Sequence, residues 1–174
     1  GMIPKPMLEV GGFPILYHQI MNLKKSNIYD IIIIIGHLGE KIREYFGDGK
    51  KYGLRIQYFE ENPNEPLGTA GALYYLKEKL DDDFVFLLAD IFFDVDLDRM
   101  IKFHKKKNAT ITLFTHPNSH PFDSDLVLTD EKSKVVGFDY KTNDRSNYDY
   151  TNLVNAGIMI FSPEILNYMT KQVK

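Results

Sequence analysis

The chain has 174 residues, 44% of them hydrophobic and 26% charged, with a formal net charge of −3 and no cysteine. This balance provides no basic surface for nucleic acid or anionic lipid, and the lack of cysteine excludes disulfides and thiolate metal sites. The apolar runs are shorter than the roughly 20 residues of a membrane helix, and the start of the chain lacks a signal-peptide pattern. We therefore expect a cytoplasmic protein with a single domain over residues 3–174, without nucleic-acid or membrane partners.

Segments typical of helices and strands alternate along the first part of the sequence. Continuous β-branched runs predict strands buried on both faces, and apolar residues spaced three or four apart predict amphipathic helices. In chain order we expect a helix over 13–26, a strand over 30–36, a helix over 38–49, a strand over 54–60, a helix over 68–80, a strand over 83–90, a helix over 96–107 and a strand over 109–116. This order predicts a mainly parallel sheet with helices on both faces.

The pattern changes after residue 116. Two short strands around a polar turn are expected within 125–141, and a further strand within 152–162. Ser162 and Pro163 have the residue types that begin a helix, which is expected to reach residue 172. The polar segment 140–152 is the one that we expect to be most mobile.

Glycines stand unexpectedly at the start of the predicted helix 68–80. Gly68, Thr69, Ala70 and Gly71 form its first turn, although glycine costs roughly 1 kcal/mol in a helix relative to alanine. A helix N-terminus offers free N–H groups and a partial positive charge to a polar or anionic ligand. Close packing of the helix on a strand would explain the glycines equally well, so both interpretations stay open.

Polar residues also mark the ends of the later strands, where ligands gather in parallel α/β sheets. Asp90 ends an apolar run, and a carboxylate there needs solvent, a hydrogen bond or a metal. Together with Asp94 and Asp96 it could hold Mg²⁺, which takes one or two carboxylates and phosphate oxygens. The alternative is that Asp94 and Asp96 cap the following helix. Asn155 and Gly157 lie in the strand NLVNAGIMIF.

Other polar residues give weaker signals. Lys5 lies between two prolines, where composition alone predicts a solvated surface lysine. The five histidines lack metal-ligand spacing. Asp123 and Asp125 fit either capping or contact with a substrate.

Four motifs in this order resemble the sugar-1-phosphate nucleotidyltransferases: PKPMLEVGGFPILYHQI, EPLGTAGAL, FVFLLADIFFDVDLDRMIKFHKKKNATITL and LVNAGIMIFSPEIL. The resemblance runs from Pro4 to about Leu166 and is strongest to the mannose-1-phosphate or heptose-1-phosphate guanylyltransferase type. It implies a three-layer, Rossmann-like α/β sandwich. It also implies a reaction of a nucleoside triphosphate, GTP foremost, with a sugar 1-phosphate, giving a nucleotide sugar and pyrophosphate with Mg²⁺.

The resemblance implies nucleotide contacts for several residues. Lys5 matches a lysine that contacts the phosphates, and Asp90 matches the metal-binding aspartate, so both are expected to be catalytic. Gly68 and Thr69 match the turn that lies against the nucleoside. The nearby acids, Glu60 or Glu61, are expected to accept hydrogen bonds from guanine.

The resemblance also implies a sugar-phosphate subsite. Asn155 and Gly157 match the sugar-contacting NAG motif, and Lys141 matches the lysine of FxEKP. Tyr140 and Thr142 stand where that motif has glutamate and proline.

Two segments of the family have no counterpart in this sequence. The family begins with a strand and a glycine-rich loop, GGxGTRLxPLT, before PKP, and it has a second metal-binding aspartate beyond the last matched motif. We therefore expect a domain without the N-terminal strand and with little or no transferase activity. Two inward sheet edges would then be unpaired unless a swapped segment, a rearranged N-terminus or a contact in a homo-oligomer covers them.

Two other functions stay open. One is a metal-dependent glycosyltransferase that uses a nucleotide sugar, with Asp94 and Asp96 in its metal motif. The other is a non-catalytic module that binds a nucleotide or a sugar phosphate, or that pairs with a full-length subunit.

Overall fold

The structure is a computed structural model that describes residues 3–62, 64–65, 67–68 and 70–170. Its strands are β1 (Glu9–Val10), β2 (Phe13–Pro14), β3 (Asp30–Ile35), β4 (Arg55–Glu60), β5 (Phe84–Leu87), β6 (Ile111–His116), β7 (Leu126–Thr129), β8 (Val135–Asp139) and β9 (Val154–Phe161). Its α-helices are α1 (Ile15–Lys25), α2 (Gly39–Phe46), α3 (Ala72–Leu76) and α4 (Leu97–Lys107). Short 3₁₀ helices are η1 (Lys5–Met7), η2 (Lys50–Tyr52), η3 (Lys77–Lys79), η4 (Pro121–Asp123), η5 (Arg145–Asn147) and η6 (Pro163–Tyr168).

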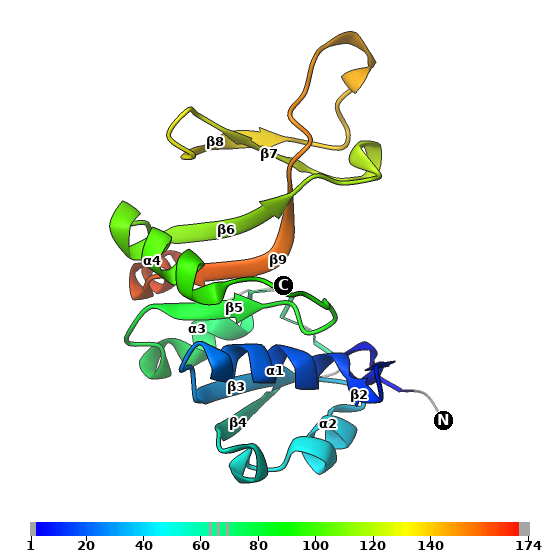
Figure 1. Cartoon of the computed structure of the whole chain (residues 1–174), viewed down its shortest axis with the longest axis vertical. Coiled ribbons are helices and arrows are strands. Elements are labelled where there is room, and N and C mark those ends of the chain that lie inside the picture. Colours follow the sequence, from blue (N-terminus) through cyan, green and yellow to red (C-terminus); the bar gives the residue numbers. More distant parts are fainter. Residues whose placement is uncertain (1–2, 63, 66, 69, 171–174) are drawn as a thin grey trace.

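The strands pair in separate groups (Figure 1). β3 and β4 are parallel, whereas β9 lies antiparallel between β5 and β6. β5 and β6 therefore run in the same direction, as the intervening helix α4 predicts. β9 returns between β5 and β6, so both of its pairings are antiparallel, whereas β3 and β4 pair in parallel as expected. β7 and β8 form an antiparallel hairpin at one end of the molecule.

The inner edges of β3 and β5 have no strand partner within the described residues. β3 pairs only with β4, and β5 pairs only with β9. All four residues of β5 are half-buried, so the expectation of a strand buried on both faces is wrong there. These inward edges of β3 and β5 are the ones that we expected to be unpaired.

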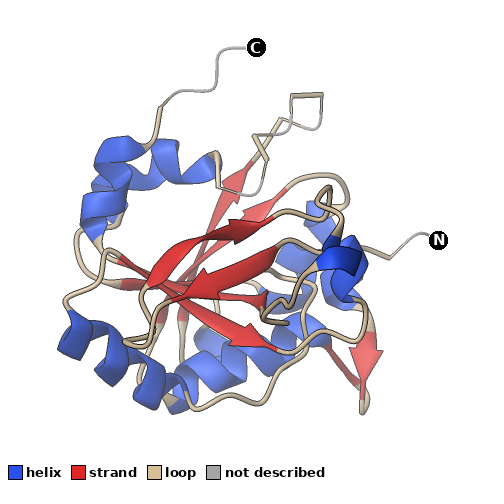
Figure 2. Cartoon of the chain, turned by 90° about the horizontal axis from the view of Figure 1, so that it is seen from above, coloured by secondary structure: helices blue, strands red, loops and turns tan. Residues whose placement is uncertain are grey.

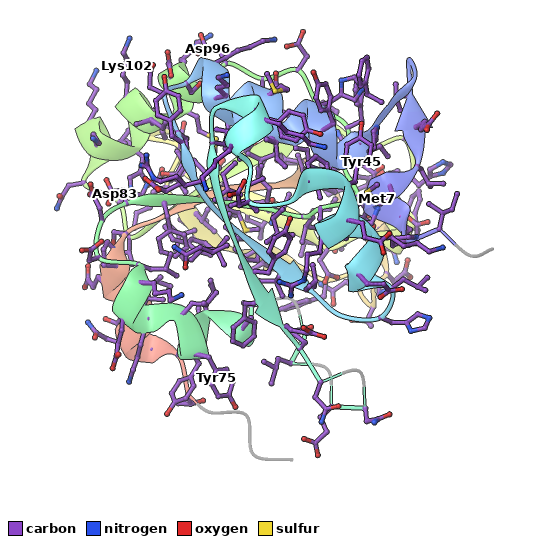
Figure 3. The ribbon with its side chains drawn as sticks, turned by 90° about the horizontal axis from the view of Figure 1, so that it is seen from below. Met7, Tyr45, Tyr75, Asp83, Asp96 and Lys102 are labelled. Carbon is purple, nitrogen blue, oxygen red and sulfur yellow. The ribbon has the colours of Figure 1, made fainter. Side chains whose placement is uncertain are left out.

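Helix α1 joins the two groups of strands through one apolar face. Leu16 and Ile20 pack in a cluster with β3, β4 and α2, and Leu23 packs in a second cluster with α4 and β9. The half-buried side chains of Met7 and Tyr45 pack against the first of these clusters (Figure 3). The helix therefore bridges the place where the strands do not pair.

Strand β9 separates two apolar layers. Ile158 and Ile160 face the cluster with α1 and α4, whereas Met159 and Phe161 pack with Leu73 of α3 and Leu166 of η6. Figure 2 shows the strands in the middle with helices on either side. The predicted three-layer α/β arrangement is thus confirmed.

Two predicted helices differ from expectation. The helix expected over 68–80 begins only at Ala72 and continues as the 3₁₀ helix η3. The helix expected over 162–172 is the 3₁₀ helix η6, and Ser162 forms no side-chain capping bond. Within the described ranges, no helix has the length and apolar character needed to cross a bilayer.

Candidate functional site

Lys5 and Asp90 lie next to each other. Lys5 begins η1, a turn that the flanking prolines favour and that closes when the Met7 amide donates to the Pro4 carbonyl at 2.8 Å. The ammonium of Lys5 lies 3.8 Å from a carboxylate oxygen of Asp90, and the two side chains are 79% and 45% exposed. Both charges are therefore accessible to solvent, and exposed pairs of this kind stabilise a fold little.

Two amides of α1 fix the backbone around Asp90. The buried side chain of Gln19 donates to the carbonyls of Leu88 and Ile91 at 2.9 and 2.6 Å, and Asn22 donates to the carbonyl of Phe93 at 3.0 Å. Buried polar groups need such partners. Sequence reasoning missed both residues, although a glutamine within the apolar stripe of an amphipathic helix is a detectable signal.

The structure brings Asn155 and Gly157 to the strand that leads to Asp90. The Leu88 amide donates to the Gly157 carbonyl at 3.0 Å, and the Gly157 amide donates to the Asn155 side chain at 3.0 Å. Gly157 has a φ of +78°, and a Cβ there would lie 2.9 Å from the Leu88 side chain. Glycine is therefore required at this position for both its conformation and its packing.

The glycine-rich turn lies on the same side of β9 as Asn155. The amide of Asn155 lies 3.5 Å from the sulfur of Met159, and Ala70 packs against the cluster that contains Met159. Gly68 has a φ of +75° with open space where a Cβ would stand. A Cβ at Gly71 would lie 2.1 Å from the Leu67 carbonyl oxygen.

Each of the two open interpretations of this turn therefore explains one glycine. Close packing within the turn accounts for Gly71, whereas Gly68 has a free face that a ligand could approach. Thr69 lies outside the described residues.

The two predicted acids of β4 and the loop after it have different surroundings. Glu60 is exposed and lies 3.4 Å from the guanidinium of Arg43. The Glu61 amide donates to the Ile35 carbonyl at 2.8 Å, which continues the pairing of β3 and β4. One carboxylate oxygen of Glu61 is buried without a hydrogen-bond partner among the described residues. Such an oxygen is costly unless a donor reaches it.

Lys141 belongs to a different part of the molecule. It follows β8, and its amide donates to the Asp125 carboxylate at 2.9 Å, which identifies Asp125 as a backbone cap. Its side chain is exposed and makes no ion pair within residues 3–62, 64–65, 67–68 and 70–170. The β7–β8 hairpin lies apart from η1 and α1 in Figure 1.

The segment after β8 contains a buried ion pair. Arg145 donates from Nε to Asp139 at 3.0 Å, and their side chains are 0% and 7% exposed. Asn143 and Tyr148 donate to the other carboxylate oxygen at 2.7 and 3.0 Å. The hydrogen bond from Asn143, followed by those from Tyr148 and Arg145, lowers the pKa of Asp139. This network ties the segment 140–152, which we expect to be the most mobile, to the end of β8.

The predicted metal residues do not form a cluster. Asp96 accepts a hydrogen bond from the Arg99 amide at 2.9 Å, so the capping interpretation is confirmed for Asp96. Within the part of the chain that the structure describes, no three histidine or acidic residues lie close enough to hold a metal ion. Asp90 alone provides a carboxylate beside Lys5, a set that fits Mg²⁺ only together with phosphate oxygens.

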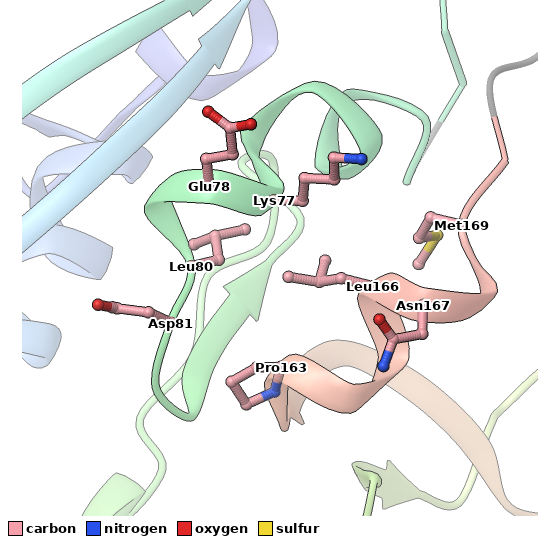
Figure 4. Close-up of a pocket in the computed structure, with 8 residues that line it drawn as sticks. All are labelled: Lys77, Glu78, Leu80, Asp81, Pro163, Leu166, Asn167 and Met169. Carbon is pink, nitrogen blue, oxygen red and sulfur yellow. The ribbon is translucent and has the colours of Figure 1, made fainter.

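Two surface hollows lie near these elements. One, of about 390 Å³, is lined by Ile91, Phe92, Phe93, Val95, Phe114, His116, Ala156 and Ile158. The other, of about 490 Å³, lies where Lys77 and Leu80 of the η3 region face Leu166 and Met169 of the η6 region (Figure 4). Among the described residues, none of those predicted for the site lines either hollow.

Sequence comparisons identify related proteins. The family model described as nucleotidyl transferase matches residues 2–174. A UTP–glucose-1-phosphate uridylyltransferase of Synechocystis is 32% identical over 179 residues, covering 96% of this chain and 46% of that protein. A mannose-1-phosphate guanylyltransferase of Mycobacterium tuberculosis is 32% identical over 165 residues, covering 94% of this chain and 44% of that protein. The chain thus spans about half the length of these relatives.

Solved structures share the fold. A Bacillus anthracis protein assigned as a glucose-1-phosphate thymidylyltransferase superposes with a TM-score of 0.80 at 22% identity, covering 94% of this chain and 65% of that one. HddC from Yersinia pseudotuberculosis superposes with a TM-score of 0.76 at 21% identity, covering 100% of this chain and 74% of that one. The fold is therefore the Rossmann-like fold of nucleotide-diphospho-sugar transferases, and by its sequence the chain belongs to the nucleotidyl transferase family.

Proposed function

We propose that this chain binds GTP and a sugar 1-phosphate for guanylyl transfer, which yields a nucleotide sugar and pyrophosphate. The observation that supports it most is the contact of Lys5 with Asp90, beside the strand segment that holds Gly157. It joins a cation and a carboxylate within one region. These are the groups that transfer between two phosphates requires.

The reaction needs charge neutralisation more than proton transfer. A phosphate oxygen of the sugar 1-phosphate attacks the α-phosphorus of GTP in line, and the bond to the β-phosphate oxygen breaks to release pyrophosphate. Lys5 offsets the negative charge that develops on the phosphates, and Asp90 would hold Mg²⁺, which supplies further neutralisation. No general base is required, because the attacking phosphate is already an anion at neutral pH.

Glu61 supports the choice of guanine. Its buried carboxylate oxygen has no hydrogen-bond partner among the described residues, and guanine presents adjacent N–H donors on one edge. Glu60 is exposed and already paired with Arg43, which makes it the weaker candidate. One relative is named for UTP and another is named a guanylyltransferase, so the relatives do not agree on the base. The choice of guanine therefore rests on Glu61 and the resemblance.

Asn155 and Gly157 are the proposed contacts on the sugar-phosphate side, and Lys141, which follows β8 in a different part of the molecule, is added to them on the resemblance. Asn155 is exposed at the start of β9, and its side-chain oxygen accepts from Gly157, which leaves its amide group next to the Met159 sulfur. Thr69 is retained as a proposed nucleoside contact on the resemblance alone.

Calorimetry with matched variants tests the assignment of the base. We expect GTP with Mg²⁺ to bind more tightly than UTP, and Glu61→Gln to weaken GTP binding by about tenfold, since hydrogen bonds to a charged group contribute roughly 1.5–3 kcal/mol. Glu60→Gln is the control and should leave binding unchanged. Equal loss of GTP and UTP binding in Glu61→Gln would contradict the role of Glu61.

The same titrations test the metal and the reaction. Asp90→Asn should abolish the dependence of GTP affinity on Mg²⁺ while GTP without metal binds as before. Pyrophosphate release from GTP and mannose 1-phosphate should be detectable but slow, because the described residues provide a single carboxylate for a metal beside Lys5. A turnover of about 10 s⁻¹, which is typical of enzymes, would contradict that expectation.

A non-catalytic binding module is the second candidate. Asp90 as the single carboxylate beside Lys5 favours it, because such a site binds phosphates without a second metal ligand from the described residues. GTP binding without pyrophosphate release would support this candidate. Failure of every nucleotide to raise the melting temperature would exclude both, because a ligand that binds the folded state must stabilise it.

A further inference from the structure

The ion pair between Asp139 and Arg145 fixes a loop at both of its ends. Asp139 is the last residue of β8, and Arg145 is the first residue of η5. Besides its contact with the carboxylate, the Arg145 guanidinium donates to the backbone carbonyl of Asp139. A planar guanidinium with several acceptors in a buried site has one orientation, so the two ends of the loop hold a fixed separation.

Further donors extend this network beyond the loop. Arg145 also donates to the carbonyl of Pro121 in η4, and its guanidinium carbon lies 6.0 Å from the centre of the Tyr150 ring. Asn143 and Tyr148 fill the remaining oxygen of Asp139. Both charges of the pair are therefore used within the fold, and neither is left to bind an exposed ligand.

Lys141 lies inside the loop that this network encloses. Its amide donates to Asp125, and the Asn143 amide donates to the Tyr140 carbonyl at 2.9 Å, which closes a turn around Lys141. Its backbone is thus held on both sides, whereas its ammonium is exposed and makes no ion pair in the described ranges. A fixed backbone beneath a free cation is preorganised for an anion.

We propose that Asp139 and Arg145 are positioning residues that hold Lys141 in place for the phosphate of a sugar 1-phosphate. This inference rests on the proposed function, which gives Lys141 its ligand. It assigns a role to two residues that sequence analysis did not single out. Neither touches the ligand, and both act through the backbone of Lys141.

Arg145→Met tests the proposal with one measurement that needs no ligand and one that does. We expect hydrogen exchange at the Lys141 amide to accelerate by about tenfold and calorimetric affinity for mannose 1-phosphate to fall by about tenfold, because small displacements of a positioning group reduce binding steeply. GTP affinity should change by less than about twofold, because the nucleotide groups lie on other elements.

Milder variants keep the test decisive where Arg145→Met does not fold. Tyr148→Phe removes a single donor to Asp139 and should produce the same changes at smaller size, and Arg145→Lys should lie between Arg145→Met and the unchanged chain. Arg55→Met is the matched control, because it removes an exposed contact with Asp30 on β3 and β4. It should leave the exchange at Lys141 and both affinities unchanged.

The possible failures are distinguishable. Unchanged exchange at the Lys141 amide in folded Arg145→Met, or an equal fall of GTP and mannose 1-phosphate affinity, would overturn the positioning role. Absence of binding of both mannose 1-phosphate and glucose 1-phosphate to the unchanged chain would instead contradict the proposed sugar-phosphate subsite itself.

Discussion

Two pairs of opposite charges in this molecule have contrasting environments. Lys5 and Asp90 are 3.8 Å apart and accessible to solvent, whereas Arg145 and Asp139 are 3.0 Å apart and almost fully buried. The first pair is held in place by other groups, among them the Gln19 amide beneath the Asp90 loop. The second pair is itself the group that holds its loop in place.

The contrast indicates that an ion pair can bind a ligand only where its charged groups are not already occupied by partners within the fold. Exposed pairs contribute little to stability, so an arriving phosphate can replace one partner at little cost. Removing one partner of a buried pair leaves an uncompensated charge and is strongly destabilising. We therefore expect substitutions at the first pair to change binding and substitutions at the second pair to change stability as well.

The largest expected effect separates the two pairs by stability. Arg145→Met leaves the Asp139 carboxylate buried without its cation, whereas Lys5→Met removes one end of an exposed contact. We expect Lys5→Met to shift the melting temperature by less than about 2 °C, and Arg145→Met to lower it several times further. Calorimetric melting of both variants checks this, and equal shifts would show that the contrast in burial has no energetic meaning.

A second comparison uses the glycines near the first pair. Gly157 and Gly68 have φ values of +78° and +75°, so alanine is strained at both. Only at Gly157 would the added Cβ meet another side chain, that of Leu88, at 2.9 Å. We expect unfolding free energy to fall by about 1–2 kcal/mol in Gly68→Ala and about 2–4 kcal/mol in Gly157→Ala.

Urea unfolding measures both changes. The double variant Gly157→Ala with Leu88→Ala is the control, because it removes the overlap and should cost less than the sum of its single changes. A larger cost for Gly68→Ala than for Gly157→Ala would mean that the open space beside Gly68 is filled.

A third variant tests how the Asp90 loop is held. Gln19→Ala removes the donor to the Leu88 and Ile91 carbonyls and should lower the unfolding free energy by about 1–3 kcal/mol. Because the loop loosens, the contribution of Mg²⁺ to GTP affinity should fall in parallel. Lys25→Ala, on the exposed side of the same helix, is the control. Unchanged Mg²⁺ dependence in folded Gln19→Ala would show that the loop does not need this support.

The helices and strands in which apolar residues recur at regular spacing over a long segment were predictable from the sequence. α1 and α4 fall within the predicted ranges, because each repeats its apolar residues over several turns. The start of α3 was not predictable from the sequence. The left-handed backbone at Gly68 and the closeness of Gly71 to Leu67 depend on how the turn before the helix folds. The place of β9 between β5 and β6 depends on long-range pairing, which the local spacing of apolar residues does not predict.

The candidate site divides in the same way. Lys5 and Asp90 could be named from motif resemblance, but their contact arises only when η1 folds against the loop after β5. Gln19 and Arg145 were missed, because polar residues are ordinarily expected in solvent. Their burial depends on acceptors 69 and 24 positions away along the chain, at Leu88 and Pro121.

The smallest expected effect concerns acid stability in the buried network. The Asn143 hydrogen bond is the leading cause that lowers the pKa of Asp139 below 3.8, the value taken for an unperturbed aspartate. A carboxyl whose pKa is lower when folded stabilises the fold above pH 3.8, and this contribution is lost as the pH falls from there through the folded value. Below both pKa values, Asp139 is protonated in the unfolded and the folded chain alike, and it no longer contributes to the pH dependence.

Asn143→Ala isolates this contribution. Other donors lower the pKa values of Asp30, Asp48 and Asp144. These three carboxylates therefore contribute equally to the pH dependence of stability in the variant and in the unchanged chain. Removing the Asn143 donor raises the folded pKa of Asp139 toward 3.8, so unfolding free energy should rise less steeply with pH in the acid range. Urea titrations at a series of acid pH values measure that slope. Identical slopes would mean that Arg145 and Tyr148 alone lower the pKa of Asp139. The side chain of Asn143, in the turn around Lys141, would then contribute nothing to the ionisation of Asp139.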